Sequence, residues 1–283
     1  MHDYQPGRRL NIGILHPGEM GSRIGGALVE AGHRVLWVST GRSKVSANRA
    51  RADGLESCNT LAKLVALAEV VLAVCPPHGA LKLSQQVMAE GFGGIYVDAN
   101  AVAPDTIRRI ASVVTAGADL VDGGIIGPPP RVPGSTRLYL SGARAPEIAT
   151  LFDDSLLEAH TIDGVPGRAS ALKMCYAAWT KGSAALLLAV AGLARAEGVE
   201  NVLWQEWDKS QPQLPAQLEA AVQSSVSKAW RFGSEMLEIA RTFEGSGLPD
   251  GFHQAAADVY GRLSDFKDGS APETDDVLNA LCK

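Results

Sequence analysis

The stretch Leu10-Asn-Ile-Gly-Ile-Leu-His-Pro-Gly-Glu-Met-Gly-Ser22 decides the fold of this chain. An apolar run ends at Leu15, Gly18 and Gly21 follow, and a helical pattern comes next. A strand, a tight turn and a helix in this order place a nucleotide's pyrophosphate on the helix N-terminus, where backbone N–H groups and the helix dipole bind it. His16 stands where the usual Gly-x-Gly-x-x-Gly pattern has its first glycine, so the assignment depends on the rest of the chain.

Short apolar runs alternate with helical patterns through the first 165 residues. The expected strands are Leu10–Leu15, Arg34–Val38, Val70–Cys75, Ile95–Asp98, Leu120–Asp122 and Arg137–Ser141. The expected helices are Ile24–Ala31, Ser43–Ala52, Thr60–Ala68, Gly79–Ala89 and Pro104–Thr115. Continuous apolar strands joined by helices predict a parallel sheet buried on both faces. Residues 1–165 are therefore expected to form a doubly wound Rossmann domain, an α/β fold that binds ligands at the carboxyl ends of its strands.

The pattern changes after Gly167, beyond which the sequence offers no convincing strand. Residues 169–197 are typical of one long helix. Further helices are expected over Val199–Lys209, Pro215–Glu244, Gly251–Phe266 and Thr274–Leu281. We therefore expect residues 166–283 to form an all-α domain.

Composition narrows the class of protein. A chain of 283 residues suits two domains better than one, and 46% apolar with 20% charged residues is ordinary for a soluble globular protein. The net charge of −5 gives no electrostatic reason to bind nucleic acid or an anionic membrane. The start is short and polar, which is unlike a signal peptide, and the four cysteines lack metal-type spacing. The sequence predicts a cytoplasmic protein that binds a small molecule and no metal, nucleic acid or membrane.

The second expected strand ends in Val38-Ser-Thr-Gly-Arg-Ser43, where an NAD site would carry an acidic residue for the ribose 2′-hydroxyl. No acidic residue occurs between Glu30 and Asp53. Arg42 stands there among small hydroxyl donors, which suits a 2′-phosphate and predicts NADP over NAD. The alternative is a solvated polar turn. Expected cofactor ligands in the first two turns are His16, Pro17, Gly18, Glu19, Met20, Ser39, Thr40, Arg42 and Ser43.

Two further strand ends would line the crevice where a nicotinamide ribose lies. They are Cys75-Pro-Pro-His-Gly79, with Cys75, Pro76 and Pro77 as expected contacts, and Asp98-Ala-Asn-Ala-Val-Ala-Pro104. Asn100 is the polar group of interest because its amide both donates and accepts hydrogen bonds. It is equally well placed to cap the N-terminus of the following helix.

Four motifs carry a resemblance to a known family. They are Gly18-Glu-Met-Gly21, Val97-Asp-Ala-Asn-Ala-Val-Ala-Pro104, Val121-Asp-Gly-Gly-Ile-Ile-Gly127 and Gly167-Arg-Ala-Ser-Ala-Leu-Lys173. Their order resembles that in β-hydroxyacid dehydrogenases, which include 6-phosphogluconate and 3-hydroxyisobutyrate dehydrogenases and have imine reductases as relatives. The resemblance covers nearly the whole chain, and the tail over residues 242–251 is similar to a branch with its own C-terminal domain. It implies a homodimer formed through the helical domains.

The resemblance implies that Lys173 is the general base, since the family carries a lysine at the matching position of its long helix. That lysine takes the hydroxyl proton while hydride leaves for the nicotinamide, and it acts as the acid in reverse. The chemistry stands without the analogy, because an amine with a pKa of about 10.4 becomes a usable base when it is partly desolvated. The alternative is a lysine that extends from an amphipathic helix into water.

Helical spacing selects the neighbours of Lys173. Tyr176 and Thr180 lie three and seven residues on, hence on the same face. The family usually has asparagine three or four residues after its lysine, and here those positions are Tyr176 and Ala177. A serine common in the family's substrate loop is also replaced, by Ile126. Expected substrate contacts are Gly123, Gly124, Gly127, Lys173, Tyr176 and Thr180, although the three glycines also suit a simple turn.

Together these patterns predict an NADP-dependent oxidoreductase acting on a small hydroxy acid or related alcohol, with Lys173 and Tyr176 as catalytic residues. Retention of the lysine favours alcohol–ketone chemistry. The first alternative is an imine reductase acting on a cyclic imine, in which Tyr176 or Lys173 supplies the proton. The second is a sensor that binds NADP without chemistry.

Overall fold

The computed structural model describes residues 8–267 and 272–283, and the chain divides into two compact units. Unit 1 ends at Lys173 and unit 2 begins at Met174. Helix α7 (Arg168–Ala196) contains both of these residues. The domain boundary expected between residues 165 and 166 stays a prediction.

Unit 1 is built on one eight-stranded sheet whose spatial order is β3-β2-β1-β4-β5-β6-β7-β8. Its strands are β1 (Asn11–Leu15), β2 (Arg34–Val38), β3 (Glu56–Cys58), β4 (Val70–Ala73), β5 (Ile95–Asp98), β6 (Asp119–Ile126), β7 (Thr136–Ser141) and β8 (Leu157–Ile162). Strands β1 to β6 are parallel. The direction of winding reverses between β1 and β4, and in such sheets the crevice for a ligand opens there, at the carboxyl ends of the strands. The predicted doubly wound fold is confirmed.

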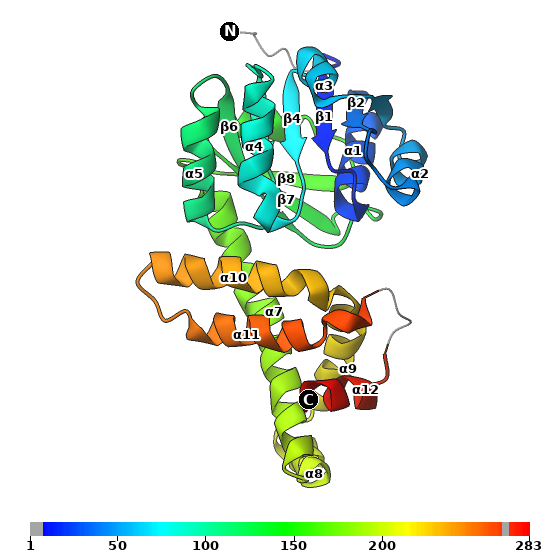
Figure 1. The fold of residues 1–283 in the computed structure, drawn as a ribbon, viewed down its shortest axis with the longest axis vertical. Helices are drawn as coiled ribbons and strands as arrows, with labels where there is room; N and C mark the ends of the chain where they lie inside the picture. The colour runs from blue at the N-terminus through cyan, green and yellow to red at the C-terminus, as the bar shows by residue number, and fades with distance from the viewer. Residues whose placement is uncertain (1–7, 268–271) are drawn as a thin grey trace. The chain divides into compact units, whose positions relative to one another are not determined.

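Helices cover both faces of this sheet (Figure 1). One apolar core lies under α1 (Glu19–Glu30), α2 (Lys44–Ala52) and α6 (Ala145–Thr150). The other lies under α3 (Leu61–Leu67), α4 (Ala80–Ala89) and α5 (Pro104–Val114). A short 3₁₀ turn, η1 (Pro77–Gly79), precedes α4. Burial on both faces is the reason the central strands are continuous apolar runs.

The sheet differs from the expectation at its edges. Strand β7 pairs antiparallel with β6, because residues 127–135 between them are rich in proline and glycine and form no crossover helix. Strands β3 and β8 and helix α6 were not predicted. Strand β3 has three residues, and β8 lies at the sheet edge with alternating exposure, so neither forms an apolar run. Helix α1 begins at Glu19 rather than Ile24.

The described residues of unit 2 form helices joined by turns, with no strand, which confirms the predicted all-α part. After α7 come α8 (Glu200–Ser210), α9 (Leu214–Ser225), η2 (Val226–Lys228), α10 (Ala229–Gly245), α11 (Gly251–Arg262), η3 (Ser264–Phe266) and α12 (Thr274–Leu281). Figure 1 shows α10 and α11 side by side. The single helix expected over Pro215–Glu244 is wrong, because the 3₁₀ turn η2 divides it into α9 and α10.

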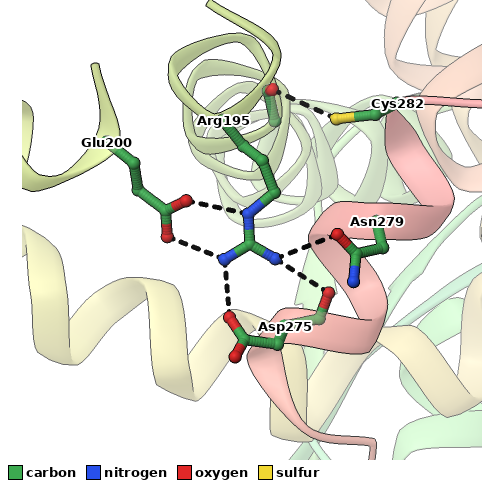
Figure 2. Close-up of polar contacts among 6 residues, drawn as sticks. Arg195, Glu200, Asp275, Asn279 and Cys282 are labelled. Carbon is green, nitrogen blue, oxygen red and sulfur yellow. Dashed lines mark hydrogen bonds and ion pairs between the residues drawn. The ribbon is translucent and has the colours of Figure 1, made fainter. Parts of the chain in front are cut away.

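Arg195 joins the end of α7 to two other helices of unit 2 (Figure 2). Its Nε and Nη2 donate to the two carboxylate oxygens of Glu200, each over 2.8 Å. The same guanidinium donates to the carboxylate and the backbone carbonyl of Asp275, and to Oδ1 of Asn279 on α12. These two carboxylates raise the pKa of Arg195 further above its usual value. The arginine is therefore a structural cross-link between α7, α8 and α12.

Candidate functional site

The turn after β1 shows how a histidine replaces the first glycine of the nucleotide motif. His16 has φ +66°, the left-handed conformation that favours glycine. Its carbonyl oxygen accepts from the Gly18 N–H over 2.7 Å, and a Cβ on Gly21 would lie 2.6 Å from the same oxygen. Gly21 therefore lets α1 pack against the turn. A Cβ on Gly18 would meet nothing within 4 Å, so the start of α1 is open to a ligand.

The side chain of His16 contacts Arg42, which follows β2. Arg42 Nη1 and His16 Nδ1 are 2.6 Å apart. Burial and the positive charge of Arg42 lower the pKa of His16 to about 4, so the imidazole is neutral at neutral pH. A guanidinium can only donate, hence Nδ1 accepts this hydrogen bond and the ring proton lies on Nε2.

The other residues predicted at the end of β2 form an ordered turn. Ser39 Oγ donates to the Cys58 carbonyl over 3.1 Å, and the Arg42 N–H donates to the Ser39 carbonyl over 3.2 Å. Ser43 Oγ accepts from the Ser46 N–H and so caps α2. Thr40 is exposed in the same turn. These contacts fix the backbone of the turn from which the Arg42 side chain extends.

A pocket of about 430 Å³ lies beside this turn within unit 1. Its walls combine apolar groups with a few polar ones, as small-molecule sites do. The lining residues are Leu15, His16, Val38, Arg42, Leu61, Leu83, Gln86, Ala89 and Glu90. His16 and Arg42 were predicted as cofactor ligands, and the other seven were missed by the sequence reasoning. The spacing of Leu83, Gln86 and Glu90 places them on one face of α4, and that signal was available in the sequence.

Asn100 joins the ends of β4 and β5. Its Oδ1 accepts from the Cys75 N–H over 2.5 Å, while its N–H and Nδ2 donate to Asp98 Oδ1 over 3.2 and 2.9 Å. Ala103 is the N-cap of α5, so the alternative of Asn100 as that helix's cap is wrong. Burial and the negative charge of Asp98 raise the pKa of Cys75 to about 12, which keeps its thiol protonated.

Asp98 was missed by the sequence reasoning as a member of this site. Its side chain is fully buried, and burial together with Asp122 raises its pKa to about 7 despite the hydrogen bonds from Asn100. Among the described residues its Oδ2 has no hydrogen-bond partner. Asp98 and Asp122 are paired in register on β5 and β6. Two acidic residues ending adjacent apolar strands were the signal for this pair.

The carboxylate of Asp122 caps the start of α7. Asp122 Oδ2 accepts from the backbone N–H groups of Gly167 and Ser170, over 2.8 and 3.0 Å, and from Ser141 Oγ over 3.0 Å. Asp122 Oδ1 accepts from Ser170 Oγ over 2.5 Å. Ser141 Oγ in turn accepts from the Ala169 N–H. Side chains of β6 and β7 therefore satisfy the N–H groups that a helix N-terminus leaves without partners.

Lys173 lies one turn further along α7, against the same face of β6. A Cβ on Gly124 would lie 3.1 Å from the Lys173 Cβ and 2.6 Å from the Ala169 carbonyl oxygen. A Cβ on Gly123 would lie 3.1 Å from that of Ala99, next to Asn100. Both glycines belong to β6, so the turn interpretation is wrong for them. Within unit 1 the structure therefore places Lys173 beside Gly124, and Ala99, which precedes Asn100, beside the neighbouring Gly123.

The remaining predicted residues are placed as follows. Gly127 has φ +119° and follows β6, where a Cβ would collide with the Ser135 carbonyl. Tyr176 and Thr180 lie further along α7 in unit 2, and Thr180 Oγ1 donates to the Tyr176 carbonyl over 3.1 Å. Pro17, Glu19 and Met20 lie in the first turn and the start of α1, and Pro76 and Pro77 directly follow Cys75. Across the described parts of the chain, no three His, Cys, Asp or Glu side chains group as metal ligands.

Two family models match this chain. Residues 11–149 match the NAD binding domain of 6-phosphogluconate dehydrogenase, and residues 194–263 match a domain of unknown function, DUF1932. The first match covers the turn of His16, the pocket beside Arg42 and the Asn100 loop.

Curated proteins also match parts of this chain. The chain is 28% identical to the uncharacterized 28.5 kDa protein in the 7S RNA 5′ region of Methanothermus fervidus, over 69% of this chain and 74% of that protein. It is 25% identical to the mitochondrial 3-hydroxyisobutyrate dehydrogenase of Drosophila melanogaster, over 58% of this chain and 52%, about half, of that protein.

Two solved structures of known enzymes share the fold. One is the 3-hydroxyisobutyrate dehydrogenase of Mycobacterium tuberculosis with L-serine, with a TM-score of 0.70, 17% identity, and coverage of 98% of this chain and 100% of that one. The other is an imine reductase of Bacillus cereus, with a TM-score of 0.57, 17% identity, and coverage of 96% and 98%.

Proposed function

We propose that this protein is an NADP-dependent oxidoreductase of a small hydroxy acid or related alcohol. The premise is that the chain belongs to the β-hydroxyacid dehydrogenase superfamily, through its NAD-binding domain of the 6-phosphogluconate dehydrogenase type. Membership of this superfamily supports oxidoreductase activity with a nicotinamide cofactor. The observation that carries the proposal is the position of Lys173 against Gly124, in the same unit as the His16 turn and the Arg42 pocket.

The residues of unit 1 fit a dinucleotide. The open start of α1 at Gly18 suits the pyrophosphate, because the backbone N–H groups of a helix N-terminus and its dipole bind anions. The apolar walls formed by Val38, Leu61 and Leu83 suit adenine. Arg42 supplies the positive charge that a 2′-phosphate requires. When bound, the nicotinamide would accept or donate the hydride.

Lys173 is the group that moves the proton. In alcohol oxidation its neutral Nζ takes the hydroxyl proton of the substrate, and in carbonyl reduction its ammonium returns that proton. Gly124 lets α7 approach β6 closely beside Lys173, since any side chain there would collide with the Ala169 carbonyl. Tyr176 and Thr180 remain the proposed substrate contacts further along α7, because their spacing places them on the same helix face as Lys173.

Imine reduction is the second candidate, and the residue that favours it is Tyr176. A phenol stands one helical turn after Lys173, at a position where the resembling dehydrogenases carry asparagine. A phenol or an ammonium can protonate the nitrogen of a cyclic imine as hydride arrives at carbon. The structural likeness to an imine reductase is consistent with this chemistry but shows the fold alone.

A substrate panel tests the proposal against both alternatives. The full chain is incubated with NADP or NAD and a set of hydroxy acids and sugar acids, and with NADPH and a set of cyclic imines, while nicotinamide absorbance is followed. We expect turnover of a hydroxy acid with NADP. Turnover confined to the imines would favour the reductase. NADPH binding measured by calorimetry, with no turnover of any compound, would make the protein a sensor.

We also propose that the protein is a homodimer formed through unit 2. Trp179, Leu186 and Leu193 of α7 recur every seven residues, hence on one helix face, and are 77%, 49% and 62% exposed. Helix α7 is long and apolar enough to cross a membrane by length and composition, a property shared by core helices of soluble proteins. We call these three residues the α7 stripe. A second copy of the chain would bury the stripe, which explains why it is apolar and exposed in one chain.

Charge placed in the stripe is expected to separate the dimer. Wild-type protein should have twice the mass of one chain by light scattering at micromolar concentration, and Trp179→Glu with Leu193→Glu should have the mass of one chain. The control is Val45→Glu on α2, which is 62% exposed outside the stripe and should leave the mass unchanged. A monomeric wild-type protein would contradict the proposal.

A further inference from the structure

We infer that His16 sets the cofactor preference, by holding the Arg42 guanidinium where it binds the 2′-phosphate of the dinucleotide. The inference rests on the proposed NADP site and adds a residue to it. His16 acts through Arg42, so it is a positioning residue for cofactor binding, in a place where dinucleotide motifs have a glycine.

The backbone of His16 indicates that its side chain is used. His16 and Asp154 are the two non-glycine residues at positive φ in the part of the chain that the structure describes. A left-handed conformation costs an L-residue about 1–2 kcal/mol relative to its normal region. Glycine would adopt the same turn without this strain. A compensating contact is therefore expected, and the 2.6 Å hydrogen bond to Arg42 is such a contact.

The contact leaves the charge of Arg42 intact. The partner is a neutral ring that accepts one hydrogen bond, because burial and Arg42 itself lower the pKa of His16. Across residues 8–267 and 272–283, no carboxylate forms an ion pair with Arg42. An arginine held by a neutral acceptor keeps its remaining N–H groups and its full positive charge for an anion.

The position of the pair ties it to the cofactor pocket. His16 and Arg42 both line the pocket of about 430 Å³, and Glu90 is another of its lining residues. The negative charge of Glu90 disfavours a second anion in the same pocket. A 2′-phosphate therefore requires a cation held in place in this pocket, and the hydrogen bond from Arg42 to His16 holds that cation. Without it, we expect the pocket to discriminate less between NADPH and NADH.

The test compares NADPH and NADH binding by calorimetry on the full chain, in four variants. His16→Gly should weaken NADPH binding by about 10-fold, the value of one hydrogen bond to a charged group, and change NADH binding by less than about 2-fold. His16→Asn is the conservative variant, since asparagine tolerates the left-handed conformation and its Oδ1 can accept from Arg42. It should keep most of the preference. In an Arg42→Ala background, His16→Gly should have no further effect on NADPH binding.

The outcomes separate this inference from the proposed function. Wild-type protein that binds NADH as tightly as NADPH would overturn both. A wild-type preference for NADPH with equal weakening of both cofactors by His16→Gly would overturn the inference alone, because the histidine would then act only on the pyrophosphate turn. Additive effects of His16→Gly and Arg42→Ala would overturn it as well. The unfolding temperature of His16→Gly should not fall, which shows that the fold is intact.

Discussion

Replacement of Lys173 by alanine is expected to lower kcat by about 10²- to 10⁴-fold for the substrate found in the panel, which is the usual contribution of a positioned acid or base. The affinity for NADPH should change by less than about 2-fold, because the proposed cofactor pocket is lined by residues of β1, β2, α3 and α4 and of the turns beside them. Stopped-flow measurement of hydride transfer, with calorimetry of NADPH binding, checks both expectations. Unchanged turnover with intact NADPH binding would remove Lys173 from the mechanism.

The pH profile gives a second measurement of the same role. A base must be neutral to accept a proton, so kcat/KM for alcohol oxidation should rise with pH and then level off. Lys173→Ala should lose this rise. The control is Lys181→Ala on the same helix. Lys181 forms an ion pair with Glu235 and lies 4.3 Å from the centre of the Phe232 ring, so its loss should lower stability while the rise of kcat/KM with pH remains.

Asp122→Ala is expected to lower the free energy of unfolding by about 3–5 kcal/mol, because several buried donors at the start of α7 lose their acceptor and each costs about 1–3 kcal/mol. Urea unfolding measures the total. Amide hydrogen exchange should show the loss of protection concentrated over residues 167–173. The kcat of Asp122→Ala should also fall, since Lys173 follows directly on the helix turn that loses its cap.

Two comparisons make this prediction specific. Asp122→Asn keeps one acceptor oxygen and should lose less stability than the alanine variant. Asp105→Ala removes an exposed carboxylate paired with Arg108 on α5, and such pairs contribute at most about 1 kcal/mol. Asp122→Ala with the stability of Asp105→Ala would show that the cap contributes little.

The sequence predicted the fold where burial is continuous. Strands β1, β2, β4 and β5 are apolar runs because helices cover both of their faces, and the alternation of strand and helix then predicts the winding. Prediction failed where a strand is short or half exposed. Strand β8 carries Glu158 and His160 on its exposed positions, and its pairing with β7 depends on neighbours distant in the sequence.

The candidate site also has residues that could be predicted from the sequence and contacts that could not. Residues that follow a strand directly, such as His16, Arg42 and Asn100, could be predicted because the fold gathers strand ends at one edge of the sheet. The contact between His16 and Arg42 could not, since it depends on a backbone conformation that histidine rarely adopts. The cap of α7 by Asp122 was also out of reach, because strand β6 and the helix that it caps are separated by more than 40 residues.

The cap on α7 has a consequence for how this protein can diversify. Lys173 takes its position from Asp122 and Ser141, which belong to the sheet that also carries the proposed cofactor turn. Tyr176 and Thr180 come after the point where unit 2 begins. The contacts that cap the start of α7 thus all lie before Met174. Changes beyond Met174 leave these capping contacts in place, and with them the start of the helix that carries the proposed proton-transfer group, Lys173.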